Sequence, residues 1–187
     1  MGKQKLRLFC SIPLPQEVSS VLAGIQKMNG KIGGIRWTRK ANMHITVRFF
    51  GAVQNEDIPN LIDALQQVTD SIPPFELAFN AFQLGPPGRR PRMVWALFNL
   101  NPVYRQLVED IDSVVGEQIC MKESNHQPIP HVTLARFDNA SIADVLRIPD
   151  TPEGKMGIQV DVVDLMESIY AGDTPVYETI KHYALKG

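Results

Sequence analysis

A short pattern that occurs twice constrains this chain more than any other feature. Residues 43–50 are MHITVRFF, and residues 130–137 are PHVTLARF. Both copies are rich in β-branched and aromatic residues, which favour β-strands. Because side chains two apart share one face of a strand, each copy sets a histidine beside a threonine and turns apolar residues to the other face. The pattern predicts two half-buried strands, each with an imidazole and a hydroxyl on its polar face.

The two copies lie far apart in the sequence. Almost half of the 187 residues separate His44 from His131. This spacing predicts two structural halves, each of which contributes one strand to a shared site. The length suits one domain, so residues 1–187 are expected to form a single domain made of two interleaved lobes.

Helical and strand patterns alternate around the two copies. Apolar residues recur at helical spacing within residues 16–28, 56–68 and 103–119, and a short helix is expected at 141–147. Besides the two motif strands, of which the first is expected to end at Gly51, strands are expected at residues 5–12, 35–37, 75–84, 93–100, 156–170 and 175–185. Short turns between neighbouring strands favour antiparallel pairing. The expected fold class is α+β, with two pseudo-symmetric lobes, each an antiparallel sheet with helices on its outer face, and an active-site cleft between them.

The composition excludes some classes of function. A net charge of −1 argues against a wide, sequence-blind nucleic-acid surface, so any basic patch must be local. The most basic loop holds Arg89, Arg90 and Arg92, and it is either a solvated loop or a contact for RNA backbone phosphates. No apolar run is long enough to span a membrane, and the start lacks the features of a signal peptide, so the cytoplasm is the expected location.

Two imidazoles and two hydroxyls suit proton transfer around an anion. Imidazole changes charge near neutral pH, so one ring can act as a base while the other acts as an acid. The hydroxyls of Thr46 and Thr133 can donate hydrogen bonds to a phosphate. No Asp or Glu lies on the polar face of either motif, so a divalent metal has few obvious oxygen ligands and none is expected. This set of residues favours metal-independent hydrolysis of a phosphodiester, above all of a strained cyclic phosphate.

The paired motifs resemble those of the 2H phosphoesterase superfamily and, within it, of the RNA 2′,3′-cyclic phosphodiesterases, also called 2′-5′ RNA ligases. Further stretches are similar to that family, so the resemblance covers essentially the whole chain: residues 7–15, Trp37, residues 49–51, residues 85–95, Glu167, Ser168, Tyr177 and Tyr183. It implies cofactor-free hydrolysis of a 2′,3′-cyclic phosphate at an RNA end to a 2′-phosphate. It also implies a weak, reversible, ATP-independent 2′-5′ joining activity.

The resemblance assigns roles to the motif residues. His44 and His131 are the expected catalytic residues, and Thr46 and Thr133 are expected to bind phosphate. It favours His44 as the acid toward the leaving oxygen and His131 as the base for water. The residues themselves leave that assignment open, and β-propensity alone is another explanation for the threonines.

Two arginines near the motifs are further candidates for phosphate binding. Arg136 matches a family arginine, but strict alternation sets it on the face opposite His131, so this role requires a bulge or a bend. A salt bridge or a surface position is the competing interpretation. Alternation sets Arg48 on the same face as His44, although relatives usually carry lysine at this position.

The expected partners are RNA ends that carry a 2′,3′-cyclic phosphate, with tRNA halves among the candidates, and the expected oligomeric state is a monomer. Three alternatives stay open. The chain could act on another cyclic phosphate or on a 2′-5′ oligonucleotide, it could bind RNA ends without catalysis, or its histidines could bind a catalytic metal. Phe9 and Trp37 are expected in the core rather than as platforms for base stacking.

Overall fold

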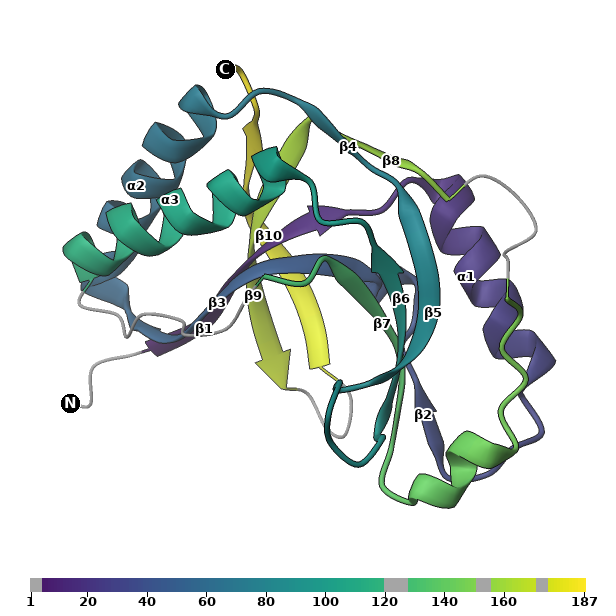
Figure 1. Ribbon diagram of the computed structural model, residues 1–187. Helices are drawn as coiled ribbons and strands as arrows, with labels where there is room; N and C mark the ends of the chain where they lie inside the picture. Colours follow the sequence, from purple (N-terminus) through teal and green to yellow (C-terminus); the bar gives the residue numbers. More distant parts are fainter. Residues whose placement is uncertain (1–4, 120–127, 151–155, 171–174) are drawn as a thin grey trace.

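A computed structural model of the chain describes residues 5–119, 128–150, 156–170 and 175–187. Its elements confirm the α+β class (Figure 1): β1 (Lys5–Pro13), α1 (Gln16–Met28), β2 (Ile35–Trp37), η1 (Lys40–Asn42), β3 (His44–Gln54), η2 (Asn55–Asp57), α2 (Ile58–Ser71), β4 (Phe75–Leu77), β5 (Phe79–Gly85), β6 (Met93–Phe98), α3 (Pro102–Ile119), β7 (His131–Phe137), η3 (Ala140–Asp144), β8 (Ile158–Val160), β9 (Val162–Tyr170) and β10 (Pro175–Ala184).

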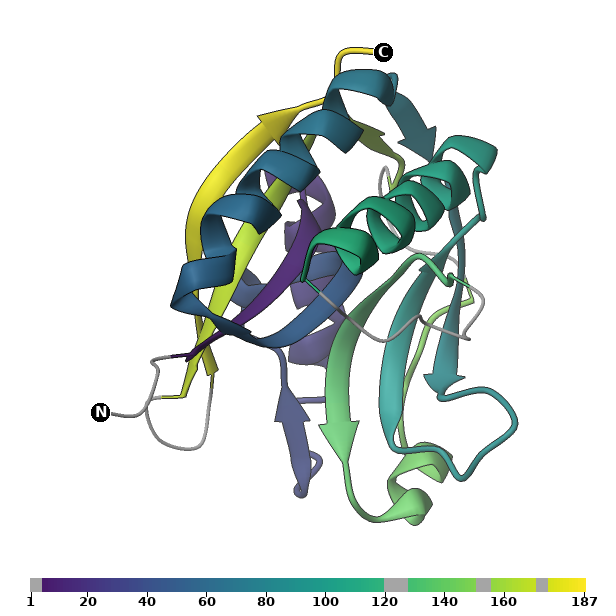
Figure 2. The ribbon, with the colours of Figure 1, turned by 90° about the vertical axis from the view of Figure 1, so that its left-hand side faces the viewer.

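Eight strands form one antiparallel sheet. Their order is β10-β9-β1-β3-β7-β6-β5, and β2 pairs with β7 beside this path. The two motif strands, β3 and β7, lie next to each other at the centre, where Ile45 pairs with Val132. This short junction divides the sheet into a half with β10, β9, β1 and β3 and a half with β7, β6, β5 and β2, which lie to the left and right in Figure 2. The antiparallel pairing expected from the short turns is confirmed.

The helices cover the sheet with the apolar stripes that the sequence predicts. Helices α2 and α3 lie side by side, α2 against β10 and α3 against β3, while α1 lies on the opposite side of the molecule (Figure 1). The stripes are buried through Leu22 of α1, Leu65 of α2 and Ile111 of α3. Burying one such side chain contributes roughly 1.5–3 kcal/mol. No helix in the described ranges is long and apolar enough to cross a membrane.

Three predicted boundaries are wrong. The strands expected at residues 75–84 and 156–170 each break into two, and the outer pieces β4 and β8 pair with each other in a separate two-stranded sheet. The carbonyl groups at the two breaks, on Ala78 and Asp161, accept hydrogen bonds from Asn99 and Leu185. Strand β3 continues past Gly51, because this glycine adopts a φ of 73° at a register shift, a conformation open to glycine.

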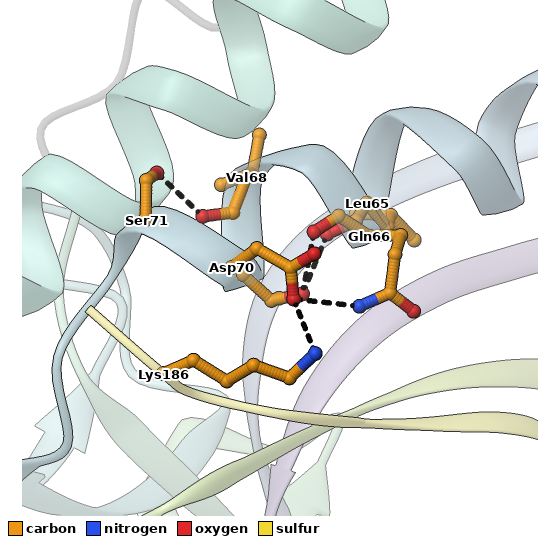
Figure 3. A network of polar contacts seen from close by, with 7 residues as sticks. Leu65, Gln66, Val68, Asp70, Ser71 and Lys186 are labelled. Atoms are coloured by element: carbon orange, nitrogen blue, oxygen red, sulfur yellow. Dashed lines mark hydrogen bonds and ion pairs between the residues drawn. The ribbon is translucent and has the colours of Figure 1, made fainter.

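The last predicted helix is shorter than expected, and the C-terminal segment packs against α2. The helix expected at residues 141–147 is a 3₁₀ turn, η3. After β10, the Lys186 ammonium group lies 2.9 Å from Oδ1 of Asp70 at the end of α2. Gln66 Nε2 donates to the same oxygen at 2.9 Å (Figure 3). These contacts tie the end of the chain to a helix from its first half.

Candidate active site

The two motif histidines come together because β3 and β7 are neighbours. Ile45 pairs with Val132, and continuing that antiparallel register by one residue each way sets His44 opposite Thr133 and His131 opposite Thr46. In such a ladder, opposite Cβ atoms are about 4.5–5.5 Å apart, and diagonal residues are about 7–8 Å apart. The two imidazoles are the diagonal pair, a spacing that fits one phosphate group between them.

One pocket of about 410 Å³ collects most of the predicted site residues. It is lined by His44, Thr46, His131, Thr133 and Arg136, while Arg48 is not among its residues. Both histidines are half-buried, so neither ring is closed off beneath packed side chains. The pocket therefore offers the two imidazoles, the two motif hydroxyls and the guanidinium group of Arg136 to one ligand, and Arg36, Arg39 and Tyr177 also line it.

Both imidazoles are held in the same tautomer. Nδ1 of His44 is 2.8 Å from the backbone oxygen of Asn42, and Nδ1 of His131 is 2.8 Å from that of Ile129. A carbonyl oxygen only accepts hydrogen bonds, so Nδ1 donates in each case, and Nε2 of each neutral ring carries no proton. Nε2 of His44 lies 3.1 Å from Oγ1 of Thr46. Nε2 is thus the atom of each ring that is available for proton exchange.

Aromatic side chains fix the planes of both imidazoles. The Trp95 ring stacks on His131 with centroids 4.1 Å apart and planes inclined by 32°. The His44 ring lies 5.0 Å from the Phe9 ring and 5.3 Å from the Tyr177 ring, measured between centroids, and it is nearly perpendicular to the Tyr177 ring. Rings held on their faces rotate little, so the direction of each Nε2 is set before a ligand binds.

Electrostatics favour the neutral form of both rings when the pocket is empty. Burial lowers the pKa of His44, and the nearby charges of His131 and Arg136 lower it further, against the raising effect of the Asn42 carbonyl. Burial and Arg136 likewise lower the pKa of His131, while the Ile129 carbonyl raises it. A bound phosphate would oppose these effects, because a nearby anion stabilises an imidazolium ion.

Arg136 reaches the pocket through a β-bulge. Thr133 pairs with Trp95 and Ala135 with Val94, which leaves Leu134 as an extra residue in β7. Leu134 and Ala135 are both fully buried, so the alternation shifts by one position. Arg136 therefore lies on the same side as His131, with Nη1 3.2 Å from Sδ of Met93. This is the bulge that the sequence analysis required for Arg136 to bind phosphate.

A matching bulge moves Arg48 out of the pocket. Thr46 pairs with Ser11 and Arg48 with Cys10, so Val47 is the extra residue of β3. Arg48 turns toward α3, where its Nε lies 2.7 Å from Oδ1 of Asp112. The prediction that Arg48 shares a face with His44 is wrong, because simple alternation does not count a bulge.

The sequence analysis noted Phe49 only as part of a family-like stretch and gave it no role in the site, yet Phe49 takes the place expected for Arg48. Phe49 lines the pocket and is 65% exposed, an unusual exposure for a large apolar side chain. It stands five residues after His44, as Arg136 stands five residues after His131. Phe9 is buried as expected, whereas Trp37 both packs on the core and lines the pocket. The matched positions in the two motifs are the signal that could have identified Phe49.

Metal ligands do not gather in this region. Among the residues for which the structure gives positions, no group of three or more His, Cys, Asp or Glu side chains could hold a metal ion. The polar groups that line the pocket are imidazoles, hydroxyls, guanidinium groups and the amide of Asn42.

Comparison with known sequences gives one family and several relatives. Residues 12–95 match the model of the family described as LigT like Phosphoesterase, a range that includes the first motif. A protein of Methanocaldococcus jannaschii named RNA 2′,3′-cyclic phosphodiesterase is 27% identical over 184 residues, which cover 95% of this chain and 100% of the relative. A Bacillus subtilis protein of the same name is 24% identical and covers 95% of each chain.

Comparison with solved structures supports the fold. The protein TT0787 of Thermus thermophilus has a TM-score of 0.84 at 23% identity, covering 97% of this chain and 99% of that one. E. coli LigT in its apo form has a TM-score of 0.79 at 24% identity, covering 98% and 99% of the two chains. At this identity the likeness establishes the architecture, and the site has to be argued from its own residues.

Proposed function

We propose that this chain is a LigT-like phosphoesterase of the 2H superfamily and that it hydrolyses 2′,3′-cyclic phosphate ends of RNA to 2′-phosphomonoesters. One observation carries the proposal: two imidazoles, each with Nδ1 bound to a backbone carbonyl, line the same pocket. The name shared by relatives that match nearly the whole chain supports the choice of substrate.

The pocket suggests how the reaction proceeds. Water attacks the phosphorus atom from the side opposite the ribose 3′ oxygen, and Nε2 of His131 takes the proton of the water. The bond from phosphorus to the 3′ oxygen breaks, and Nε2 of His44, protonated as an imidazolium ion beside the bound phosphate, gives its proton to that oxygen. Each of these proton transfers accelerates a reaction by about 10²–10⁴-fold. The resemblance to the family, rather than the geometry, favours His44 as the acid.

The remaining polar groups would stabilise the transition state. Thr46 and Thr133 lie opposite the histidines across the strand junction, so their hydroxyls can donate to the non-bridging phosphate oxygens. Arg136 adds a positive charge on the His131 side of the pocket. Groups held in place before the reaction stabilise developing charge without having to reorganise.

Several finer points belong to the same proposal. The same displacement, with the 5′-hydroxyl of a second RNA attacking the phosphorus in place of water and the 3′ oxygen leaving, would give weak, reversible 2′-5′ joining without ATP. The substrates would include tRNA halves, and the protein would act as a monomer in the cytoplasm without a metal. Of these points, the joining reaction depends on the same two histidines.

The test uses an RNA oligomer that ends in a 2′,3′-cyclic phosphate, with EDTA present. We expect the wild type to release only the 2′-phosphate, and His44→Ala and His131→Ala each to lose about 10²–10⁴-fold in kcat/KM. Thermal unfolding checks that both variants keep the fold. Full turnover by either variant, or loss of wild-type turnover on chelation, would contradict the mechanism.

A panel of other substrates separates the alternatives. It contains other cyclic phosphates and 2′-5′ oligoadenylate, measured with the same wild-type protein. We expect the highest kcat/KM on cyclic-phosphate RNA ends. Tight binding of RNA ends without any product would favour a binding module instead.

A further inference from the structure

A second hollow, of about 320 Å³, lies beside the catalytic pocket. Three guanidinium groups line it, together with apolar walls and one carboxylate: Arg89, Arg90, Arg92, Pro86, Phe137 and Asp138. We call it the arginine hollow. Neither the family resemblance nor the proposed reaction assigns it a role.

The arginine hollow and the catalytic pocket adjoin, because Arg36 lines the pocket and lies 2.7 Å from Asp138, which lines the hollow. Arg92 of the hollow is followed in sequence by Met93, which lines the catalytic pocket. Arg136 of the pocket is followed by Phe137 and Asp138 of the hollow, and Nη1 of Arg136 touches Sδ of Met93 at 3.2 Å. Two residues of extended strand span about 7 Å. A polymer that leaves the catalytic pocket on this side therefore enters the arginine hollow after a short step.

The hollow carries positive charge that no carboxylate balances. Arg89, Arg90 and Arg92 are exposed, and none of them forms an ion pair with any residue in the described part of the chain. The carboxylate of Asp138 already binds Arg36 through two contacts, at 2.7 and 3.2 Å. The hydrogen bond and the charge of Arg36 lower the pKa of Asp138, so this pair is neutral overall. In a chain with a net charge of −1, these three arginines and the arginines that line the catalytic pocket form a local basic region, as the composition allows.

The backbone holds this loop against the sheet. The N–H of Arg92 donates to the carbonyl oxygen of Gly85 at 2.9 Å, and the N–H of Phe137 donates to the carbonyl oxygen of Arg92 at 2.9 Å. The base of the loop is therefore closed at β5 and fastened to the end of β7. A loop fixed in this way loses less conformational entropy when it binds a ligand.

We propose that the arginine hollow binds backbone phosphates of the RNA strand that leads to the terminal cyclic phosphate. The inference rests on the proposed function, and it specifies the substrate: an oligonucleotide end rather than a free nucleoside cyclic phosphate. Guanidinium groups suit this ligand, because each contact with a phosphate releases condensed counterions and can form paired hydrogen bonds. Contacts to the backbone read no bases, so the hollow adds affinity without sequence preference.

The experiment compares a nucleoside 2′,3′-cyclic phosphate with a five-nucleotide RNA that ends in the same nucleoside cyclic phosphate. For the wild type at low salt, we expect kcat/KM to be at least tenfold higher for the oligomer. In the triple variant R89Q/R90Q/R92Q, the ratio of the two kcat/KM values should fall toward one. For single strands, log affinity falls with log salt by roughly 0.7 for each phosphate contact, so the salt slope for the oligomer should flatten by about 2.

A control variant, K27Q/K31Q/R105Q, loses the same charge at exposed positions that line neither pocket. It should keep the wild-type ratio, and an equal fall in both triple variants would show that net charge alone is responsible, which overturns the inference. A wild type that turns over both substrates with equal kcat/KM also overturns it, while the proposed function stands. A wild type that turns over neither substrate overturns the proposed function itself. The single variants R89Q and R90Q repeat the measurement with smaller changes, so instability of the triple variant does not decide the result.

Discussion

At the scale of single residues, the site depends on how each imidazole is held. A carbonyl two residues before each histidine fixes its tautomer, and aromatic rings fix its plane. The sequence identifies His44 and His131 through their repeated motif, but it contains no sign of which rings will pack on them. Trp95, for example, lies 36 positions before His131. Its contact with this histidine follows from the pairing of β6 with β7.

Arg136 should affect the pH dependence of the reaction. Its positive charge lowers the pKa of His44 and of His131, so Arg136→Gln should raise both values. Imidazoles with a higher pKa stay protonated to higher pH, and the bell-shaped profile of kcat/KM should therefore move to higher pH. Because the variant also loses the hydrogen bond that the Arg136 guanidinium group would donate to phosphate, the maximum kcat/KM should fall by about 10- to 100-fold. The measurement is the pH profile of kcat/KM, with Arg105→Gln on α3 as control, and an unmoved profile in R136Q would contradict this role.

Trp95 should act as a positioning residue for His131. Trp95→Ala removes the ring that stacks on the imidazole, and we expect kcat to fall by up to about 10²-fold with a smaller change in KM. Trp95→Phe keeps an aromatic face and should recover most of the loss. Steady-state kinetics of the two variants checks this, and equal losses in both would mean that stacking is not what Trp95 contributes.

At the scale of elements, the two motif strands share a bulge that determines which arginine reaches the site. Val47 and Leu134 follow the two threonines at the same position, and each is the extra residue of its strand. The shift turns Arg136 into the pocket and Arg48 toward α3. The alternation of side chains along a strand predicts neither orientation, since a bulge depends on the partner strand as much as on the sequence of the bulged strand.

Gly85 should be required at the end of β5. A Cβ atom there would lie 2.7 Å from the Trp95 ring, so Gly85→Ala must displace the ring or the strand. Overpacking of this kind costs about 1–3 kcal/mol, and it should also lower turnover through Trp95. Gly24→Ala in α1 is the control, because no atom lies within 4 Å of its added Cβ. Alanine favours a helix over glycine, so G24A should stabilise the protein by about 0.5–1 kcal/mol. Denaturant unfolding measures both, and a stable G85A variant would contradict the packing argument.

The contact between Arg48 and Asp112 should stabilise the fold rather than serve catalysis. The two side chains are only 14% and 21% exposed, and they link β3 to α3. Asp112→Ala leaves the guanidinium group half-buried without this partner, and we expect a loss of about 1–3 kcal/mol in the free energy of unfolding. The double variant R48M/D112L should recover part of it, since removing both charges avoids an uncompensated one. At temperatures well below the unfolding transition, turnover by the variants should match the wild type. A large drop in kcat/KM would instead indicate that Arg48 has a role in catalysis.

At the scale of the whole molecule, the two halves of the sheet are interleaved along the chain. One half pairs β1 and β3 with β9 and β10, so the first and last parts of the sequence lie together. The other half takes β2, β5, β6 and β7 from between them. The tail beyond β10 also returns to α2 through Lys186. No cut in the chain would separate the two halves of the sheet.

Fragments should therefore fail to fold alone. Residues 1–100 and 101–187 divide the chain between β6 and α3, and each fragment would lack partner strands for an edge inside the sheet. We expect neither fragment to unfold cooperatively or to turn over substrate, and mixing them should restore some activity. Calorimetry and the cyclic phosphate assay check this. A cooperative transition in either fragment alone would contradict a single domain made of interleaved lobes.

Local patterns in the sequence determine much of this protein. The apolar stripe of α1 predicts its bounds at Gln16 and Met28, and the repeated motif predicts that His44 and His131 act together. Both depend on residues close in sequence, whose spacing sets the face on which they lie. The breaks at Ala78 and Asp161 show the limit, because apolar alternation continues where the strand changes its partner.

Only the tertiary structure decides which way the residues beyond each threonine face. Arg136 enters the pocket, Arg48 leaves it and Phe49 takes its place, because each motif strand bulges against a neighbour that the motif itself does not specify. The same holds for the arginine hollow, whose loop joins the site through the end of β7. Periodicity is a property of one strand, whereas a bulge and the junction of two pockets are properties of pairs of strands, so they are settled only when the sheet assembles.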